Sequence, residues 1–306
     1  MSKAYAFTRN GGPEVEAFVD RETPRPDPGQ LLVAVRAAGV NPVDWKLRGG
    51  YRRAGDAPAE FPQIFGNEVA GVVATIGEDV TGFAVGDAVF GNPVTGGYAE
   101  YTLLPAALTA HKPDDLSFTV AATLPVAAAT AYDGVRQLAL APGATLLVTG
   151  AGGGVGAAAA QIARAEGVRV VGVASEGKKE FVESLGAVHV SSGPGFAGRV
   201  RTVAPDGVDA LFDLVGGTVL REAAAVVADP AKVITAADVT TATELGGAAV
   251  ARARTSDVLD AVADLARKGT LDPHVTRTYP LEQAGDALHA VEEGHAQGKI
   301  VIEVGA

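Results

Sequence analysis

The sequence predicts an α/β protein in two parts, a β-rich, barrel-like unit and a doubly wound parallel sheet. Two observations carry this prediction. The first third of the chain holds short apolar runs bounded by Gly, Pro and Asp, which is typical of strands. From Ala144, strand-like and helix-like segments alternate, which indicates a parallel sheet covered by helices. The 306 residues, 47% hydrophobic and 20% charged, are enough for about two domains with real cores.

The β-rich part comes first. Apolar and β-branched residues cluster or alternate in runs that read as strands of one barrel-like unit. The Ala-rich stretch from about Leu116 to Leu140 then changes to helical periodicity. The predicted strands lie within 30–40, 68–77, 86–91 and 96–104.

The second part has the strand–helix–strand order of a doubly wound sheet. Its predicted strands are 145–150, 168–175, 208–217 and 231–237, with helices at 155–167, 178–187 and 219–228 between them. The tail adds helices at 257–269 and 281–294 and a last strand at 298–304. We predict one domain from 1–117 with 271–306 and a second from 118–270.

Composition excludes several classes of function. A net charge of -11 disfavours binding to nucleic acid or to an anionic membrane. Neither a signal peptide nor a spanning segment is visible, so we expect a cytoplasmic protein that acts on a small molecule. The absence of Cys excludes disulfides and thiolate zinc sites. Arg48, Arg52 and Arg53 form a small basic group, interpreted as a solvated loop in preference to a phosphate-binding patch.

The strongest motif is a Gly-rich loop between a buried strand and a helix. At the dinucleotide-fingerprint spacing the key positions are Ala151, Gly153 and Gly156. Gly lets the backbone approach a pyrophosphate, and the helix N-terminus offers N–H groups and partial positive charge. This context favours a dinucleotide site over a flexible Gly turn. The predicted cofactor-binding residues of the loop are Gly152, Gly153, Gly154, Val155 and Gly156.

Charge at the end of the next strand distinguishes the two coenzymes. NADH sites place an acid there to accept from the ribose 2′-OH. Here Ser175 ends the strand, and Lys178 and Lys179 follow, which suits the 2′-phosphate of NADPH. Glu176 argues the other way, and both lysines could instead be exposed helix residues. We predict NADPH as the cofactor.

A series of further motifs runs along nearly the whole chain. In order they are GGPEV, AAGVNPVDWKLRGG, GNEVAGVVATIG, VGDAVFG, GGYAEY, LPVAAATAY, VTGAGGGVG, FDLVGG and YPLEQAGDALHAVEEGHAQGKIVIEV. With these segments in this order the sequence resembles the medium-chain dehydrogenase/reductase superfamily. NPVDWK and the closing segment resemble more narrowly the quinone oxidoreductase branch, which includes zeta-crystallin and plant enone reductases. This resemblance implies a GroES-like catalytic domain followed by a Rossmann dinucleotide-binding domain.

The zinc ligands of the alcohol dehydrogenases in this superfamily have no counterpart. Asn41 and Pro42 stand where those enzymes have a Cys, and Asn67 replaces the His of their GHE motif. The five His residues show no metal-ligand spacing, so we predict no metal site. Zinc stabilises developing negative charge on a substrate oxygen. Without it, a quinone or an α,β-unsaturated carbonyl is the expected acceptor, because conjugation spreads that charge and hydrogen-bond donors suffice.

The resemblance also implies roles for residues beside the nicotinamide. Asn41, Asp44 and Lys46 are expected near the nicotinamide ribose. Lys46 is expected to donate to a ribose hydroxyl or to the oxygen of the acceptor. The alternative is a surface Lys whose stem packs on apolar residues. Tyr51 is either a proton donor or an aromatic wall of the pocket, so Tyr51 and Lys46 are the candidate catalytic residues. Thr130 matches the residue that bonds the carboxamide of the coenzyme.

Other matches concern the far end of the coenzyme and the wider function. Lys179 matches a 2′-phosphate contact, whereas Gly193 replaces a Tyr beside the adenosine, and Asp213 is interpreted as a structural acid. The leading hypothesis is an NADPH-dependent quinone reductase. An enoyl or alkenal reductase and a non-catalytic NADPH-binding protein are the alternatives. By analogy a homodimer is expected.

Overall fold

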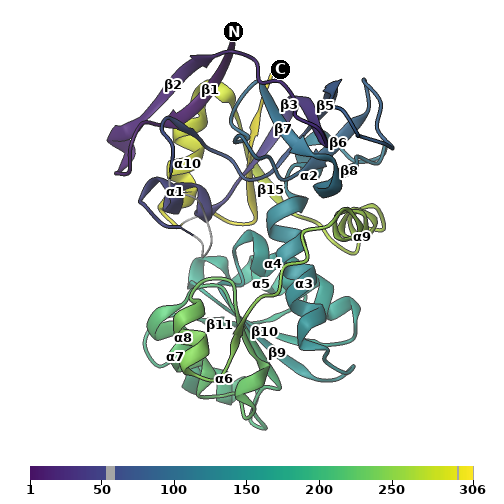
Figure 1. The fold of residues 1–306 in the computed structure, drawn as a ribbon. Coiled ribbons are helices and arrows are strands. Elements are labelled where there is room, and N and C mark those ends of the chain that lie inside the picture. The colour runs from purple at the N-terminus through teal and green to yellow at the C-terminus, as the bar shows by residue number, and fades with distance from the viewer. Residues whose placement is uncertain (53–58, 295, 306) are drawn as a thin grey trace. The chain divides into compact units, whose positions relative to one another are not determined.

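The computed structural model describes residues 1–52, 59–294 and 296–305 and confirms the predicted α/β class (Figure 1). The chain forms two compact units. The first unit comprises Met1–Val126, Arg254–Asp264 and Val275–Ala306, and the second comprises Ala127–Ala253 and Leu265–His274. The predicted domains instead divide at 117 and 270, because a change of periodicity marks where a helical stretch begins and not which unit packs against it.

The first unit is built mainly from antiparallel strands. One sheet has the strand order β2-β1-β4, and a larger sheet has the order β15-β16-β3-β5-β6-β8, with β7 paired to β3. The elements are β1 (Ser2–Phe7), β2 (Glu16–Arg21), β3 (Gln30–Val40), α1 (Pro42–Arg48), β4 (Gln63–Ile64), β5 (Val69–Ile76), β6 (Ala88–Gly91), β7 (Tyr101–Pro105), β8 (Thr109–His111), α2 (Phe118–Ala121), β15 (Val275–Pro280), α10 (Ala284–Glu292) and β16 (Lys299–Glu303); α9 (Ser256–Arg267) begins in this unit and ends in the second.

Aromatic residues fill the centre of the first unit. Phe65 lies 4.9 Å from Phe7, 5.6 Å from Tyr5 and 6.0 Å from Tyr98, measured between ring centroids. These rings are buried together with aliphatic side chains from β3 and β16. Such pairs add stability beyond the area that they bury. The loop around Phe65 is therefore held firmly next to α1.

The second unit is a parallel sheet with the strand order β11-β10-β9-β12-β13-β14. In Figure 1 the sheet lies between α3 with α4 on one side and α6, α7 and α8 on the other, as a doubly wound fold requires. The elements are α3 (Ala129–Leu138), β9 (Thr145–Thr149), α4 (Gly154–Ala165), β10 (Arg169–Ala174), α5 (Lys179–Ser184), β11 (Val188–Ser191), α6 (Phe196–Val203), β12 (Ala210–Asp213), α7 (Gly217–Ala224), β13 (Val233–Thr235), α8 (Val239–Glu244) and β14 (Ala248–Ala249).

The strand order reverses at β9, whose neighbours are β10 and β12. In open α/β sheets ligands bind outside the carboxyl ends of the strands at such a switch point. The Gly-rich loop follows β9 and therefore lies at the place where this topology favours a ligand.

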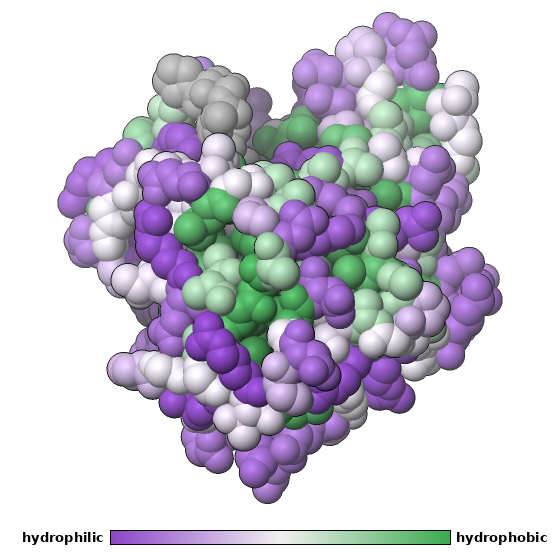
Figure 2. All heavy atoms as spheres, turned by 90° about the horizontal axis from the view of Figure 1, so that it is seen from below, coloured by the Kyte–Doolittle hydropathy of each residue, from purple (hydrophilic) through white to green (hydrophobic). Residues whose placement is uncertain are grey.

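The surface seen in Figure 2 is largely hydrophilic, in keeping with the net charge of -11, and an apolar area lies near its middle. Within the described residues no helix is long and apolar enough to cross a membrane.

Candidate functional site

The Gly-rich loop of the second unit leaves no room for a side chain at Gly156, in the first turn of α4. Gly150 follows β9 with a φ of +70°, and Gly153 caps α4 in an extended conformation. A Cβ on Gly156 would lie 2.4 Å from the backbone oxygen of Gly150 and 2.6 Å from Ala151 Cα. Only Gly allows α4 to begin this close to the strand. The first N–H groups of α4 have no partner within their own helix, so they are available to an anion. The loop thus fits the pyrophosphate of a dinucleotide.

Asp213 holds the strand ends below this loop together. Its carboxylate accepts from Thr149 Oγ1 on β9 and from Thr235 Oγ1 on β13, both at 2.7 Å. It also accepts from the backbone N–H of Gly216 at 3.0 Å. The side chain is fully buried. Asp213 is therefore a structural acid, as the sequence indicates, that fixes three parallel strands at their carboxyl ends.

The residues predicted to read the 2′-phosphate follow β10 directly. Ser175 accepts from the backbone N–H of Lys178 at 2.9 Å in a short turn. Ser175, Glu176 and Lys179 are exposed, while Lys178 is half-buried, and burial lowers the pKa of its ammonium. Lys178 and Lys179 therefore follow the strand end at which dinucleotide sites contact the ribose 2′ position, and the exposed Glu176 lies next to them in the sequence. Thr130, predicted at the carboxamide, is buried on α3 of the same unit.

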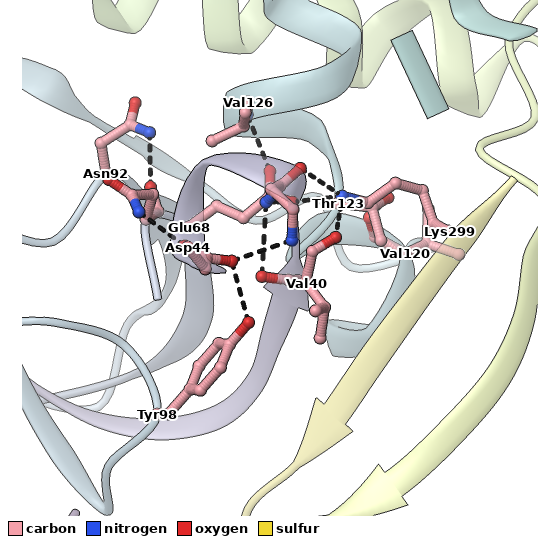
Figure 3. A network of polar contacts seen from close by, with 12 residues as sticks. Val40, Asp44, Glu68, Asn92, Tyr98, Val120, Thr123, Val126 and Lys299 are labelled. Carbon is pink, nitrogen blue, oxygen red and sulfur yellow. Dashed lines mark hydrogen bonds and ion pairs between the residues drawn. The ribbon is translucent and has the colours of Figure 1, made fainter. Parts of the chain in front are cut away.

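In the first unit the NPVDWK segment forms α1 and is held by buried hydrogen bonds (Figure 3). Asp44 accepts from the backbone N–H of Asn41 at 2.8 Å, from Tyr98 Oη at 2.9 Å and from Asn67 Nδ2 at 2.6 Å. Asp44 is only 1% exposed. Burial raises its pKa to about 6, although these hydrogen bonds oppose the shift. Asp44 therefore fixes the start of α1.

An ion pair lies beside Asp44 in the same network. Lys299 Nζ donates to Glu68 Oε1 at 2.8 Å, to Asn41 Oδ1 at 2.7 Å and to the Val40 carbonyl at 3.0 Å. Glu68 also accepts from Asn41 Nδ2 at 2.8 Å and from the backbone N–H of Val126 at 2.7 Å. Glu68 and Lys299 are 0% and 3% exposed. We call Asn41, Asp44, Asn67, Glu68, Tyr98 and Lys299 the Glu68–Lys299 network.

Two of the predicted site residues are accessible on α1 and just after it. Lys46 is half-buried, with Nζ 5.7 Å from the centroid of the Trp45 ring, and Tyr51 is 49% exposed. The backbone N–H of Tyr51 donates to the Lys46 carbonyl at 2.9 Å, which brings the two residues together. Asn41 and Asp44, in contrast, are buried with their side chains bonded inside the protein.

The interpretation of the basic group as a solvated loop is wrong for Arg48. Its side chain is 2% exposed, forms an ion pair with Glu16, and donates to Glu292 at 2.6 Å and to the Gly11 carbonyl at 3.2 Å. The helical register of α1 turns Arg48 inward, opposite two carboxylates far away in the sequence. Arg53 lies outside the described residues.

A small pocket opens next to α1 within the first unit. Its volume is about 90 Å³, and Asp44, Gln63 and Asn67 are its polar lining residues. Gln63 Oε1 is buried without a hydrogen-bond partner among the described residues, which favours a bound water or ligand at this wall. The apolar lining includes Phe7, Leu47, Ile64, Phe65, Pro93 and Val94.

Sequence reasoning missed the buried partners of this site. Lys299 is a lone Lys in the apolar run KIVIE of β16, a pattern that signals a paired buried charge. No sequence pattern marked Tyr98 as a buried hydrogen-bond partner of Asp44. In the ranges 1–52, 59–294 and 296–305 no group of three or more His, Cys, Asp or Glu is arranged to hold a metal ion.

Comparison with known proteins identifies the family. Residues 27–114 match the alcohol dehydrogenase GroES-like domain, and residues 185–302 match a family model described as zinc-binding dehydrogenase. A quinone oxidoreductase from Mus musculus is 31% identical over 99% of this chain and 98% of its own length. This chain belongs to the medium-chain dehydrogenase/reductase family. The predicted GroES-like and Rossmann folds are thereby confirmed.

Other members of the family differ in their named coenzymes. An NADPH-dependent alkenal/one oxidoreductase from Arabidopsis thaliana is 32% identical over 98% of this chain and 79% of its own length. An NAD-dependent alcohol dehydrogenase from Sulfolobus acidocaldarius is 30% identical over 93% of this chain and 95% of its own. A mycobacterial protein solved in complex with NADPH has a TM-score of 0.88 and 29% identity, covering 99% of this chain and 100% of that one. The chain is thus an oxidoreductase of this family that uses a nicotinamide coenzyme.

The raised pKa of Asp44 predicts how stability changes with pH. The pKa of Asp44 is about 6 in the folded protein, whereas it is near the ordinary value of 3.8 in the unfolded chain. Between these values the folded state binds more protons, so the contribution of Asp44 to stability falls by about 3 kcal/mol as pH rises. Urea unfolding from pH 3.5 to pH 7 measures this fall as a difference between the protein and Asp44→Asn. A difference that does not change with pH would show that Asp44 titrates normally.

Proposed function

We propose that this protein reduces a quinone, or another conjugated carbonyl compound, by hydride transfer from NADPH and without zinc. The observation that carries the proposal is the close approach of Gly156 to Gly150, which makes a dinucleotide loop at the switch point of the sheet. Relatives named quinone oxidoreductase and alkenal/one oxidoreductase support the acceptor class.

The coenzyme would be held mainly by the second unit. The backbone of the loop binds the pyrophosphate, and the cations after β10 bind the 2′-phosphate. When bound, the nicotinamide supplies the hydride, so the protein's own task is to position the two reactants. The residues of the second unit proposed to contact the coenzyme are Gly152, Gly153, Gly154, Val155, Gly156, Ser175, Lys178, Lys179 and Thr130. In the first unit Lys46 is proposed to bind the nicotinamide ribose, whereas the buried Asn41 and Asp44 are proposed to position α1.

The donor set of the first unit supports a mechanism without zinc. The chain has no Cys. Asn67 stands at the position where zinc enzymes have a His, and its amide N–H donates to Asp44. The Glu68 carboxylate is already neutralised by Lys299. An acceptor that delocalises its own negative charge needs a Lewis acid less than a simple ketone does, because the ketone concentrates that charge on one oxygen.

Hydrogen-bond donors would stabilise the charge that remains on the acceptor oxygen. Lys46 presents its ammonium from the last turn of α1, and Tyr51, just after that helix, presents a half-exposed phenol. Either group could donate to an enolate or phenolate oxygen as it forms. Because a quinone product takes up protons from solvent at neutral pH, it needs a dedicated donor less than an enone does.

Replacing Tyr51 separates the two acceptor classes. We expect Tyr51→Phe to lower kcat for an enone by about 10²-fold, as for loss of a general acid, and to leave kcat for 1,4-benzoquinone nearly unchanged. Steady-state oxidation of NADPH with each acceptor measures both. The role of proton donor is refuted if both rates are unchanged.

A reductase of enones or alkenals is the second candidate, supported by the named activity of the Arabidopsis relative. Binding of NADPH without turnover would instead point to a non-catalytic role. Oxidation of NADPH in the presence of 1,4-benzoquinone, an enone and cyclohexanone distinguishes the three cases. We expect the first two acceptors, and not cyclohexanone, to be reduced. The cytoplasmic location and the homodimer remain predictions.

A further inference from the structure

The side chain of Lys178 lies across Gly152 in the phosphate loop. A Cβ built on Gly152 would lie 2.5 Å from Lys178 Cδ, 3.3 Å from its Cβ and 3.4 Å from its Cγ. The φ of Gly152 is not in the left-handed region, so the backbone itself would accept an L side chain there. The stem of Lys178 therefore occupies the space that a side chain of Gly152 would take.

This contact joins the two parts of the coenzyme site in the second unit. Gly152 belongs to the loop between β9 and α4, which suits a pyrophosphate. Lys178 belongs to the turn after β10, at the strand end where the ribose 2′ position is read. The stem is half-buried, and its burial lowers the pKa of the ammonium. A nearby phosphate would stabilise the charged form.

We propose that Gly152 is a positioning residue for coenzyme choice, because it leaves space for the Lys178 stem and so holds that ammonium ready for the 2′-phosphate of NADPH. The inference rests on the proposed use of a nicotinamide coenzyme. An ammonium and a phosphate form a charge-assisted hydrogen bond, whereas NADH offers only a hydroxyl at the same position. A stem packed against the loop loses less side-chain entropy on binding than a free Lys does.

Adding a methyl group at Gly152 tests the packing directly. In Gly152→Ala the far end of the Lys178 stem must swing away, which a flexible side chain does at little cost to folding. Gly177→Ala is the matched control. It adds the same methyl group next to Lys178 in the sequence, at a Gly whose Cβ would meet nothing within 4 Å. Lys178→Met keeps most of the stem and removes the charge.

Fluorescence titration with NADPH and with NADH gives the dissociation constants of each variant. In both Gly152→Ala and Lys178→Met we expect the Kd for NADPH to rise about tenfold and the Kd for NADH to change less than about twofold. Gly177→Ala should match the unaltered protein. The double variant Gly152→Ala/Lys178→Met should be no weaker than Lys178→Met alone, because both changes remove one interaction.

The inference is overturned if Gly152→Ala weakens NADPH and NADH equally, since the methyl group would then obstruct the pyrophosphate. It is also overturned if the two changes add in the double variant. Neither result contradicts the proposed function. That proposal fails only if the unaltered protein binds no nicotinamide coenzyme or reduces no conjugated acceptor.

Discussion

Lys299→Met is expected to lower the free energy of unfolding by about 3 to 5 kcal/mol, the cost of leaving a buried charge without its partner. Glu68, which has no exposed surface, would lose its cationic partner. Asn41 Oδ1 and the Val40 carbonyl would lose the same donor. Since Asn41 precedes α1, we also expect α1 to be held less firmly and quinone turnover to fall.

Urea unfolding of three variants checks this account. Lys3→Met, on an exposed position of β1, should change stability by less than about 0.5 kcal/mol. Lys299→Met/Glu68→Gln should recover part of the loss, because it removes both charges. If Lys299→Met is no less stable than Lys3→Met, the ion pair does not support the first unit.

Gly156→Ala has the largest expected effect on coenzyme binding. The new methyl group would lie 2.4 Å from the Gly150 backbone oxygen, and neither the strand end nor the helix can move freely. Overpacking of this kind costs about 1 to 3 kcal/mol, and displacing α4 withdraws its N–H groups from the pyrophosphate. We expect the Kd for NADPH and for NADH to rise together by at least about 10²-fold.

Gly198→Ala is the matched control for this variant. Gly198 lies within α6 of the same unit, and a Cβ there would meet nothing within 4 Å. Its Kd for either coenzyme should equal that of the unaltered protein, and Ala should stabilise its helix slightly. Unchanged coenzyme affinity in a folded Gly156→Ala would remove the loop from the proposed site.

The fold and the coenzyme loop could be predicted because their signals are local. Alternating strands and helices reveal a doubly wound sheet, and the spacing of Gly153 and Gly156 reveals the loop. The hydrogen bonds that fix the start of α1 could not be predicted from the sequence, because Asp44 accepts them from Asn67 and Tyr98 in distant segments. Those contacts depend on tertiary packing.

The same limit explains the residues that were missed or misread. Arg48 belongs to a sequence rich in Arg and Gly, which is typical of a solvated loop, yet it is buried and pairs with the buried Glu16 and the half-buried Glu292. Lys299 is paired with Glu68, which is far away in the sequence. Partners of buried charges come from long-range contacts that a periodicity does not encode. The contact between Gly152 and Lys178 likewise required the β9–α4 and β10 turns to be seen side by side.

In the proposed reaction hydride passes from NADPH to a conjugated acceptor without a metal. The most direct measurement is NADPH oxidation by EDTA-treated protein with 1,4-benzoquinone, combined with elemental analysis for zinc. We predict quinone-dependent turnover by protein that contains far less than one zinc per chain and no gain when zinc is added. Turnover that appears only with stoichiometric zinc would contradict the account.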